Sequence, residues 1–191
     1  MQTSTLTRTP AWRRAPRRWL ICLDLQRDHV VPGRPRYAAE NAAVAAACAR
    51  VLRLARDEGW RIVHSQLRQA DGSQWPRELF SAPIEGLRPL ISEPVFFRRG
   101  SLSAFSDPGF AAELREARGD EVFLIGFSLA DTGLATALGA VDEGLSLTLL
   151  DDAVGAGASA AAAAAARLVL EPFVSLAPSR RIDGRALELM S

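Results

Sequence analysis

The sequence contains no lysine, and all 23 of its basic residues are arginine. A Schiff-base lysine, a phosphate-loop lysine and a lysine general base are therefore excluded. The chain has only two cysteines and two histidines. That excludes a framework of several disulfides and a four-thiolate zinc site, and it argues against a histidine-rich metal cage. We therefore predict that the protein uses no metal and no cofactor.

Long apolar runs and a strong net charge are also missing. No run approaches the roughly 18 apolar residues that a membrane-spanning helix needs, and the formal net charge is +1. We accordingly predict no membrane and no nucleic-acid partner. The richness in alanine, arginine and leucine is typical of a GC-rich genome, so we expect a bacterial, cytoplasmic protein.

The N-terminal segment differs from the rest of the chain. Residues 1–18 carry five arginines, no acidic residue and no apolar core of a signal peptide. We predict a flexible, Arg-rich arm over 1–18 and a single domain over 19–191. A transit peptide or a polyanion-binding arm is the alternative for this segment.

Beyond the arm, strand-like apolar runs alternate with helix-like segments about six times, which predicts an α/β fold with a parallel sheet between helix layers. We expect strands at 19–25, 60–66, 94–98, 121–127, 145–150 and 173–177. We expect helices at 38–58, 107–117, 130–143, 158–170 and 183–190. The first strand is apolar almost throughout, and such a run is typical of a strand at the centre of a sheet.

Ligands of parallel sheets bind beyond the carboxyl ends of the strands. That rule selects Asp24, Gln26, Ser65, Gln66, Arg98, Arg99, residues 128–132, Asp151 and Asp152. Burial would raise the pKa of Asp24 and make it a proton donor or acceptor. The alternative is a carboxylate that only accepts loop N–H groups. Arg98 and Arg99 are either partners of a carboxylate or an ordinary solvated pair.

The turn after the fourth strand, residues 126–133, reads GFSLADTG. Backbone N–H groups at such a helix start form a natural anion site. Ser128 or Asp131 can equally be a plain helix N-cap.

Four segments together resemble the isochorismatase-like (cysteine hydrolase) superfamily: LDLQRD at 23–28, FRRGSLSAF at 97–105, GFSLADTGLATALGAVDEG at 126–144 and LLDDAVGA at 149–156. The resemblance implies a three-layer, Rossmann-like sandwich with a six-stranded, mainly parallel sheet. It also implies a triad of Asp, Lys and Cys.

Those triad positions fall on Asp24, Arg99 and Thr132. We therefore predict Asp24, Arg99 and Thr132 as catalytic positions that line one cavity. A threonine hydroxyl is a far weaker nucleophile than a thiolate. Cys22 lies inside a strand and Cys48 in mid-helix, so neither replaces the missing thiol, and a conventional cysteine amidase is disfavoured.

The resemblance leaves two functions open. The first is hydrolysis of a small vinyl ether or related substrate, in which Asp24 protonates the enol carbon and Arg99 neutralises a substrate carboxylate. The second is a catalytically silent relative that binds a small molecule or a partner protein. The resemblance also implies a homo-oligomer. Further substrate-binding residues are predicted at Gln26, Phe105, Ser128 and Asp131.

The two histidines lack the spacing of the nicotinamidase metal site. His64 lies within the second strand and His29 in the first loop. We predict that His64 is a core or subunit-interface residue.

Overall fold

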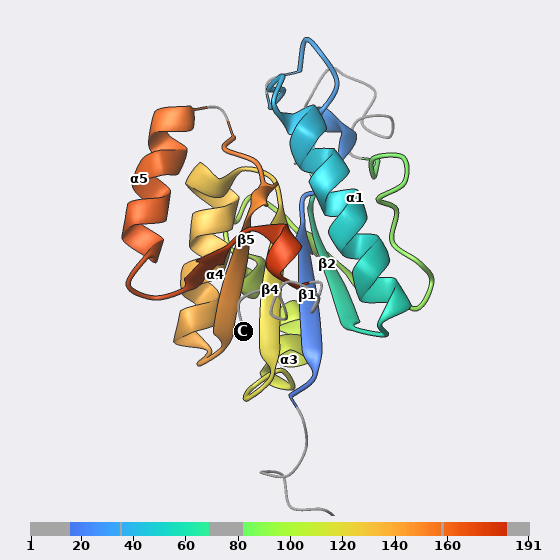
Figure 1. Cartoon of the computed structure of the whole chain (residues 1–191), viewed down its shortest axis with the longest axis vertical. Coiled ribbons are helices and arrows are strands. Elements are labelled where there is room, and N and C mark those ends of the chain that lie inside the picture. The colour runs from blue at the N-terminus through green and yellow to red at the C-terminus, as the bar shows by residue number, and fades with distance from the viewer. Residues whose placement is uncertain (1–15, 35, 69–81, 158, 183–191) are drawn as a thin grey trace, which may run out of the picture.

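The computed structural model describes residues 16–34, 36–68, 82–157 and 159–182 (Figure 1). The strands are β1 (Arg18–Leu23), β2 (Arg61–Leu67), β3 (Val95–Arg98), β4 (Glu121–Gly126), β5 (Ser146–Val154) and β6 (Ser175–Ala177). The α-helices are α1 (Asn41–Asp57), α3 (Pro108–Arg115), α4 (Leu134–Asp142) and α5 (Ala160–Leu170). Short helical turns are η2 (Arg27–His29), η3 (Ala104–Ser106), η4 (Leu129–Gly133) and η5 (Ser179–Ile182). The predicted helix at 183–190 lies outside the described residues.

All six strands form one parallel sheet in the order β3-β2-β1-β4-β5-β6. The predicted α/β sandwich is confirmed, and so is the central position of the first strand. β1 lies between β2 and β4 because it is apolar on both faces and fully buried along most of its length. The order reverses at β1, so the crevice at the carboxyl ends of β1 and β4 is a topological switch point.

Helices cover both faces of the sheet (Figure 1). On one face α1 packs through Ala47, Cys48 and Leu52 against Leu20 and Ile125, among others. On the other face α3, α4 and α5 contribute to a second buried cluster that includes Trp19, Phe110 and Leu124. Because side chains alternate between the two faces along each strand, the buried residues form two core layers, one on each side of the sheet.

Gly126 ends β4 where β1 also ends, and it has a φ of +140°. A Cβ atom placed there would lie 1.9 Å from the carbonyl oxygen of Leu23. Only glycine allows that approach. The close contact sets the turn into η4 directly beside the residue that follows β1.

Two expected boundaries are corrected. Arg18 belongs to β1 and not to the arm, because its guanidinium pairs with Glu58 and Glu121 and its backbone is in register with β4. The predicted helix at 130–143 begins with the wide π-helical turn η4 before α4 continues it. None of the helices within the described ranges is long and apolar enough to cross a membrane.

Candidate active site

Asp24 follows the last residue of β1 and adopts the left-handed conformation, with a φ of +51°. This conformation is uncommon for a residue other than glycine and is favoured mainly by Asp and Asn. The backbone N–H of Asp24 donates to the Ser65 carbonyl at 2.9 Å, and its own carbonyl accepts from Gln26 at 2.6 Å. The strained residue is therefore held between β2 and the loop after β1.

The two carboxylate oxygens of Asp24 have different surroundings. Oδ1 accepts the backbone N–H of Leu67 at 2.9 Å and also Nη2 of Arg98. Oδ2 is equally buried, but among the described residues no hydrogen-bond partner reaches it. Both side chains of the ion pair are 0% exposed. One oxygen therefore anchors the carboxylate, and the other has no partner among the described residues.

Arg98, the last residue of β3, uses each of its three guanidinium nitrogens. Nε donates to Oγ of Ser65 at 3.0 Å, Nη1 to the carbonyl of Leu102 at 2.6 Å, and Nη2 to Asp24. Arginine carries a permanent charge and has donors in fixed directions. Its main effect is to fix the carboxylate of Asp24 and to place a positive charge beside it.

The structure pairs Arg98 with Asp24, in the place where the sequence prediction put Arg99. Arg99 is exposed on the loop that follows β3. Side chains alternate along a strand, and Phe96 packs edge-on against Phe110 of α3, so Arg98 two residues later faces the same interior. The structure therefore brings Arg98, and not Arg99, into contact with the Asp24 carboxylate.

Thr132 lies in η4 at the carboxyl end of β4, the same sheet edge as Asp24, and it is buried. Its hydroxyl lies 3.4 Å from the Phe127 carbonyl and 3.5 Å from the Ser128 carbonyl, both at the long limit of a hydrogen bond. Its backbone N–H donates to Oδ1 of Asp131 at 2.5 Å. The hydroxyl is thus associated with backbone carbonyls and with no described base, an arrangement that does not activate a nucleophile.

Gln26 and Asp131, two predicted substrate-binding residues, are partly engaged with the protein itself. The Gln26 amide both donates to and accepts from the backbone of Leu67, each at 3.0 Å. It thereby holds the β2 end that binds Asp24. Asp131 is exposed, and its carboxylate accepts the N–H of Thr132. Both residues shape the backbone around the site.

Phe105 lies in η3 and packs edge-on against Phe110 at a centroid distance of 5.1 Å. Thr136 of α4 accepts the backbone N–H of Ala104 and holds this turn in place. Ser128 is the second non-glycine residue with positive φ, +62°, and its carbonyl accepts the N–H of Gly133 at 2.9 Å. The substrate contacts expected for Phe105 and Ser128 stay predictions.

Both cysteines are buried in the core cluster between α1 and the sheet. Burial raises the pKa of the Cys48 thiol to about 12 and that of Cys22 well above its usual value. Cys48 donates to the carbonyl of Ala153 at 3.2 Å beneath α1. These thiols are therefore not available as thiolates for hydrolysis.

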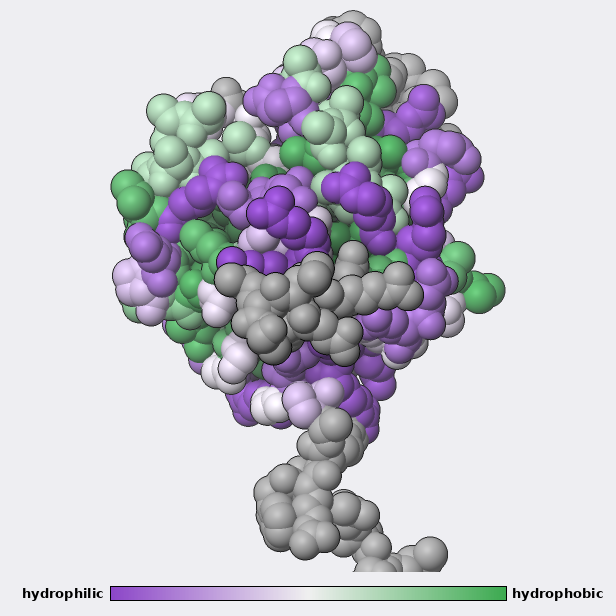
Figure 2. Space-filling model, viewed as in Figure 1, coloured by the Kyte–Doolittle hydropathy of each residue, from purple (hydrophilic) through white to green (hydrophobic). Residues whose placement is uncertain are grey.

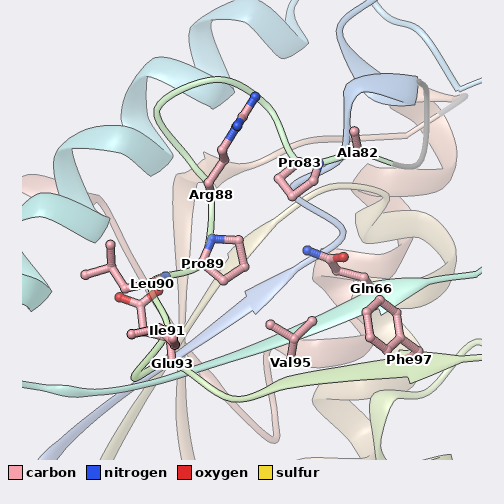
Figure 3. Close-up of a pocket in the computed structure, with 10 residues that line it drawn as sticks. All are labelled: Gln66, Ala82, Pro83, Arg88, Pro89, Leu90, Ile91, Glu93, Val95 and Phe97. Carbon is pink, nitrogen blue, oxygen red and sulfur yellow. Dashed lines mark hydrogen bonds between the residues drawn. The ribbon is translucent and has the colours of Figure 1, made fainter. Parts of the chain in front are cut away.

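A cavity of about 760 Å³ opens beside the carboxyl half of β2 and β3 (Figure 3). Gln66 and Phe97 line it from the strands, and Pro89 and Leu90 line it from the segment that leads into β3. None of the predicted catalytic residues lines this cavity. Within the described part of the chain, no group of three or more His, Cys, Asp or Glu side chains is placed to hold a metal ion.

Sequence reasoning selected Asp24, the edge of the sheet and the pair Arg98 and Arg99, but it missed two backbone groups. The Leu67 N–H, which binds Asp24, and the Leu102 carbonyl, which binds Arg98, leave no signal in side-chain identity. The choice between Arg98 and Arg99 did have a signal. That signal is the alternation of side chains along β3. Phe97 and Arg99 lie on one face and are exposed, so Arg98 lies on the opposite face.

Comparison with known proteins identifies the family of the chain. The isochorismatase domain profile matches residues 18–178, so the chain belongs to the isochorismatase family of hydrolases. The maleamate amidohydrolase of Pseudomonas putida is 29% identical over 152 residues, which is 71% of each chain.

Solved structures share the fold. The putative isochorismatase hydrolase from Oleispira antarctica superposes with a TM-score of 0.76 at 19% identity, over 87% of this chain and 96% of that one. The pyrazinamidase of Pyrococcus horikoshii, solved with zinc, gives a TM-score of 0.74 at 21% identity, over 85% and 99%. At these identities the likeness establishes the fold alone.

Proposed function

We propose that this protein is a thiol-independent hydrolase of a small molecule, in which Asp24 moves the proton. The observation that carries the proposal is the asymmetry of the Asp24 carboxylate, with Oδ1 fixed by Leu67 and Arg98 and Oδ2 buried without a partner. A buried polar atom without a partner costs stability unless a ligand or water completes it. That cost is typical of a site kept ready for a substrate.

Two reactions use the same oxygen. In amide hydrolysis, Oδ2 takes a proton from water while the water oxygen adds to the carbonyl carbon. The C–N bond then breaks, and the leaving amine takes that proton. In vinyl-ether hydrolysis, a protonated Oδ2 gives its proton to the enol carbon. Water adds to the resulting cation and returns a proton to Asp24, and the hemiacetal falls apart to a carbonyl compound and an alcohol.

The two reactions need Oδ2 of Asp24 in opposite protonation states. Amide hydrolysis needs a free carboxylate that takes a proton from water, whereas the vinyl-ether route needs a proton on Oδ2 first. The pH dependence of kcat/KM separates the two reactions. If Asp24 acts as a base, kcat/KM decreases as the pH falls. If Asp24 acts as an acid, kcat/KM decreases as the pH rises.

The experiment compares wild type with Asp24→Asn on isochorismate and on maleamate, which represent the two reactions. The Asn variant keeps the shape and removes the transferable proton, so turnover should fall about 10²–10⁴-fold. Cys22→Ser and Cys48→Ser are the controls and should leave the chemical step nearly unchanged. Activity that survives Asp24→Asn but is abolished by a cysteine variant would overturn the proposal.

The second candidate is a catalytically silent family member that binds a small molecule or a partner. The observation in its favour is that the Thr132 hydroxyl is associated with backbone carbonyls, while Asp24 and Thr132 are at most 1% exposed. Absence of turnover on both substrates, together with ligand binding that survives Asp24→Asn, would favour this function. Loss of activity in Thr132→Ala, with a trappable acyl group on Thr132 in the parent, would instead make Thr132 the nucleophile.

Assembly and location stay predictions. We propose a homo-oligomer in a bacterial cytoplasm that acts on a small-molecule substrate. Apolar side chains gather on the surface of α5 and just beyond it, where Leu168, Val169 and Phe173 are exposed (Figure 2). A subunit contact would cover such a surface.

A further inference from the structure

His29 is a buried side chain with a fixed orientation, five residues after Asp24 in η2. Its ring stacks on Phe127 at a centroid distance of 4.8 Å and an interplanar angle of 10°. Its backbone N–H donates to the Gln26 carbonyl at 3.2 Å, and its carbonyl accepts Nδ2 of Asn41 at 2.9 Å. Backbone and ring are therefore held independently of any ligand.

The ring nevertheless keeps one polar atom unused. His29 is 1% exposed, and Nδ1 is buried without a hydrogen-bond partner among the described residues. A phenylalanine ring would stack on Phe127 in the same way and would bury no unpaired polar atom. A polar ring at an apolar stacking position is therefore a feature that packing alone does not explain.

His29 belongs to the same edge of the sheet as the Asp24 centre. Phe127, on which it stacks, joins β4 to η4, and the N–H of Phe127 donates to the carbonyl of Leu23 directly before Asp24. Arg98 and Asp131 both lie within electrostatic reach of the imidazole. The ring thus packs on Phe127 at the junction of β4 and η4, and the charges of Arg98 and Asp131 act on it.

The surroundings keep the imidazole neutral. Burial lowers the pKa of His29 to about 3, the charges of Arg36 and Arg98 act in the same direction, and Asp131 opposes them. A neutral imidazole has one N–H donor, and the nearby positive charges favour an electron-rich oxygen opposite it. The matching ligand group is an acceptor oxygen of a carbonyl or carboxylate.

We infer that His29 is a substrate-binding residue of this site and that its Nδ1–H donates to an acceptor oxygen of the molecule held at Oδ2 of Asp24. The inference rests on the proposed function for the location of the substrate. It adds the residue that fixes the orientation of the substrate through a second polar contact. Specificity for a substrate with such an oxygen then follows, because a substrate without it leaves Nδ1 unpaired.

The test measures binding separately from turnover, with all variants made in the Asp24→Asn background. Dissociation constants for maleamate and isochorismate are measured by calorimetry. His29→Phe keeps the stack on Phe127 and removes the polar atom, while His29→Asn keeps a polar atom close to the position of Nδ1. We expect His29→Phe to weaken binding about tenfold, the effect of one hydrogen bond, and His29→Asn to restore part of it.

Thermal unfolding of the same proteins provides the control for folding. His29→Phe should melt at the same temperature as its parent or higher, because it removes an unpaired buried atom. Weaker binding by a protein that is at least as stable identifies a ligand contact. Unchanged affinity in His29→Phe, or failure of both molecules to bind the Asp24→Asn parent, overturns the inference. Turnover that survives Asp24→Asn overturns the proposed function instead, so the two failures are distinguishable.

Discussion

Asp24 and Glu93 are both buried carboxylates paired with an arginine, yet their hydrogen bonding differs. Oε1 of Glu93 accepts Nε of Arg56 at 2.8 Å. Oε2 accepts Nη2 of Arg56 at 3.0 Å, the N–H of Leu90 at 2.9 Å and the His64 ring at 2.9 Å. Both oxygens of Glu93 are satisfied, whereas Oδ2 of Asp24 has no described partner.

The electrostatics of Glu93 follow from this saturation. Burial alone would raise the pKa of Glu93, but the hydrogen bonds from His64, Arg56 and Leu90 outweigh it and lower the pKa to about 2. The network joins α1, β2 and the segment that enters β3, where Glu93 also borders the cavity in Figure 3. Glu93 is therefore a structural link, and His64 is its core partner.

The comparison shows that burial and an ion pair do not by themselves identify a functional carboxylate. What distinguishes Asp24 is the unfilled coordination of one oxygen, together with a strained backbone at a topological switch point. Removing the partner of Asp24 should then affect both folding and chemistry. Removing Glu93 should affect folding alone.

The largest expected effect in this comparison is that of Arg98→Gln. The change leaves Asp24 buried beside no compensating charge, so the free energy of unfolding should fall by about 3–5 kcal/mol. Turnover by the protein that remains folded should also fall, because Oδ1 loses the donor that orients the carboxylate. Urea unfolding and steady-state kinetics on the same preparation measure the two effects.

Arg99→Gln is the matched control, one residue away with the same change in charge. Because Arg99 is exposed, its substitution should change the free energy of unfolding by no more than about 0.5 kcal/mol. Equal losses for the two variants would show that Arg98 has no special relation to Asp24. Arg98→Lys sharpens the result, since an ammonium keeps the charge but cannot reproduce three donors in one plane.

Much of the fold followed from the sequence, because apolar runs and helix caps are local signals. The strand at 19–25 was placed at the sheet centre from its composition, and Asp107 does cap α3 by accepting from Gly109 and Phe110. The site was only partly predictable. Tertiary contacts with β2 determine the positive φ of Asp24 and bring the Leu67 N–H to Oδ1. The sequence of side chains does not predict either feature.

The next largest effect is expected for Glu93→Gln, which removes the charge from a saturated network. Arg56 and His64 then bind a neutral amide, and the loss of charged hydrogen bonds should lower the free energy of unfolding by about 1.5–3 kcal/mol. Turnover by the folded protein should be retained. Glu85→Gln is the control, because the Glu85 side chain is 90% exposed in its pair with Arg88 and its loss should scarcely matter.

The smallest expected effect is the pH dependence of the difference in unfolding free energy between wild type and Glu93→Gln. The folded protein holds the pKa of Glu93 at about 2, below the ordinary value of 4.5. A carboxylate with a lowered pKa stabilises the fold above its unfolded pKa, and that contribution is lost as the pH falls towards the folded value. The stability gap between wild type and Glu93→Gln should therefore be constant near neutral pH, narrow below about pH 4.5 and close near pH 2. Urea midpoints for both proteins across this range measure the gap. A gap that persists undiminished to pH 2 would mean that the shape of Glu93, and not its charge, holds the network together.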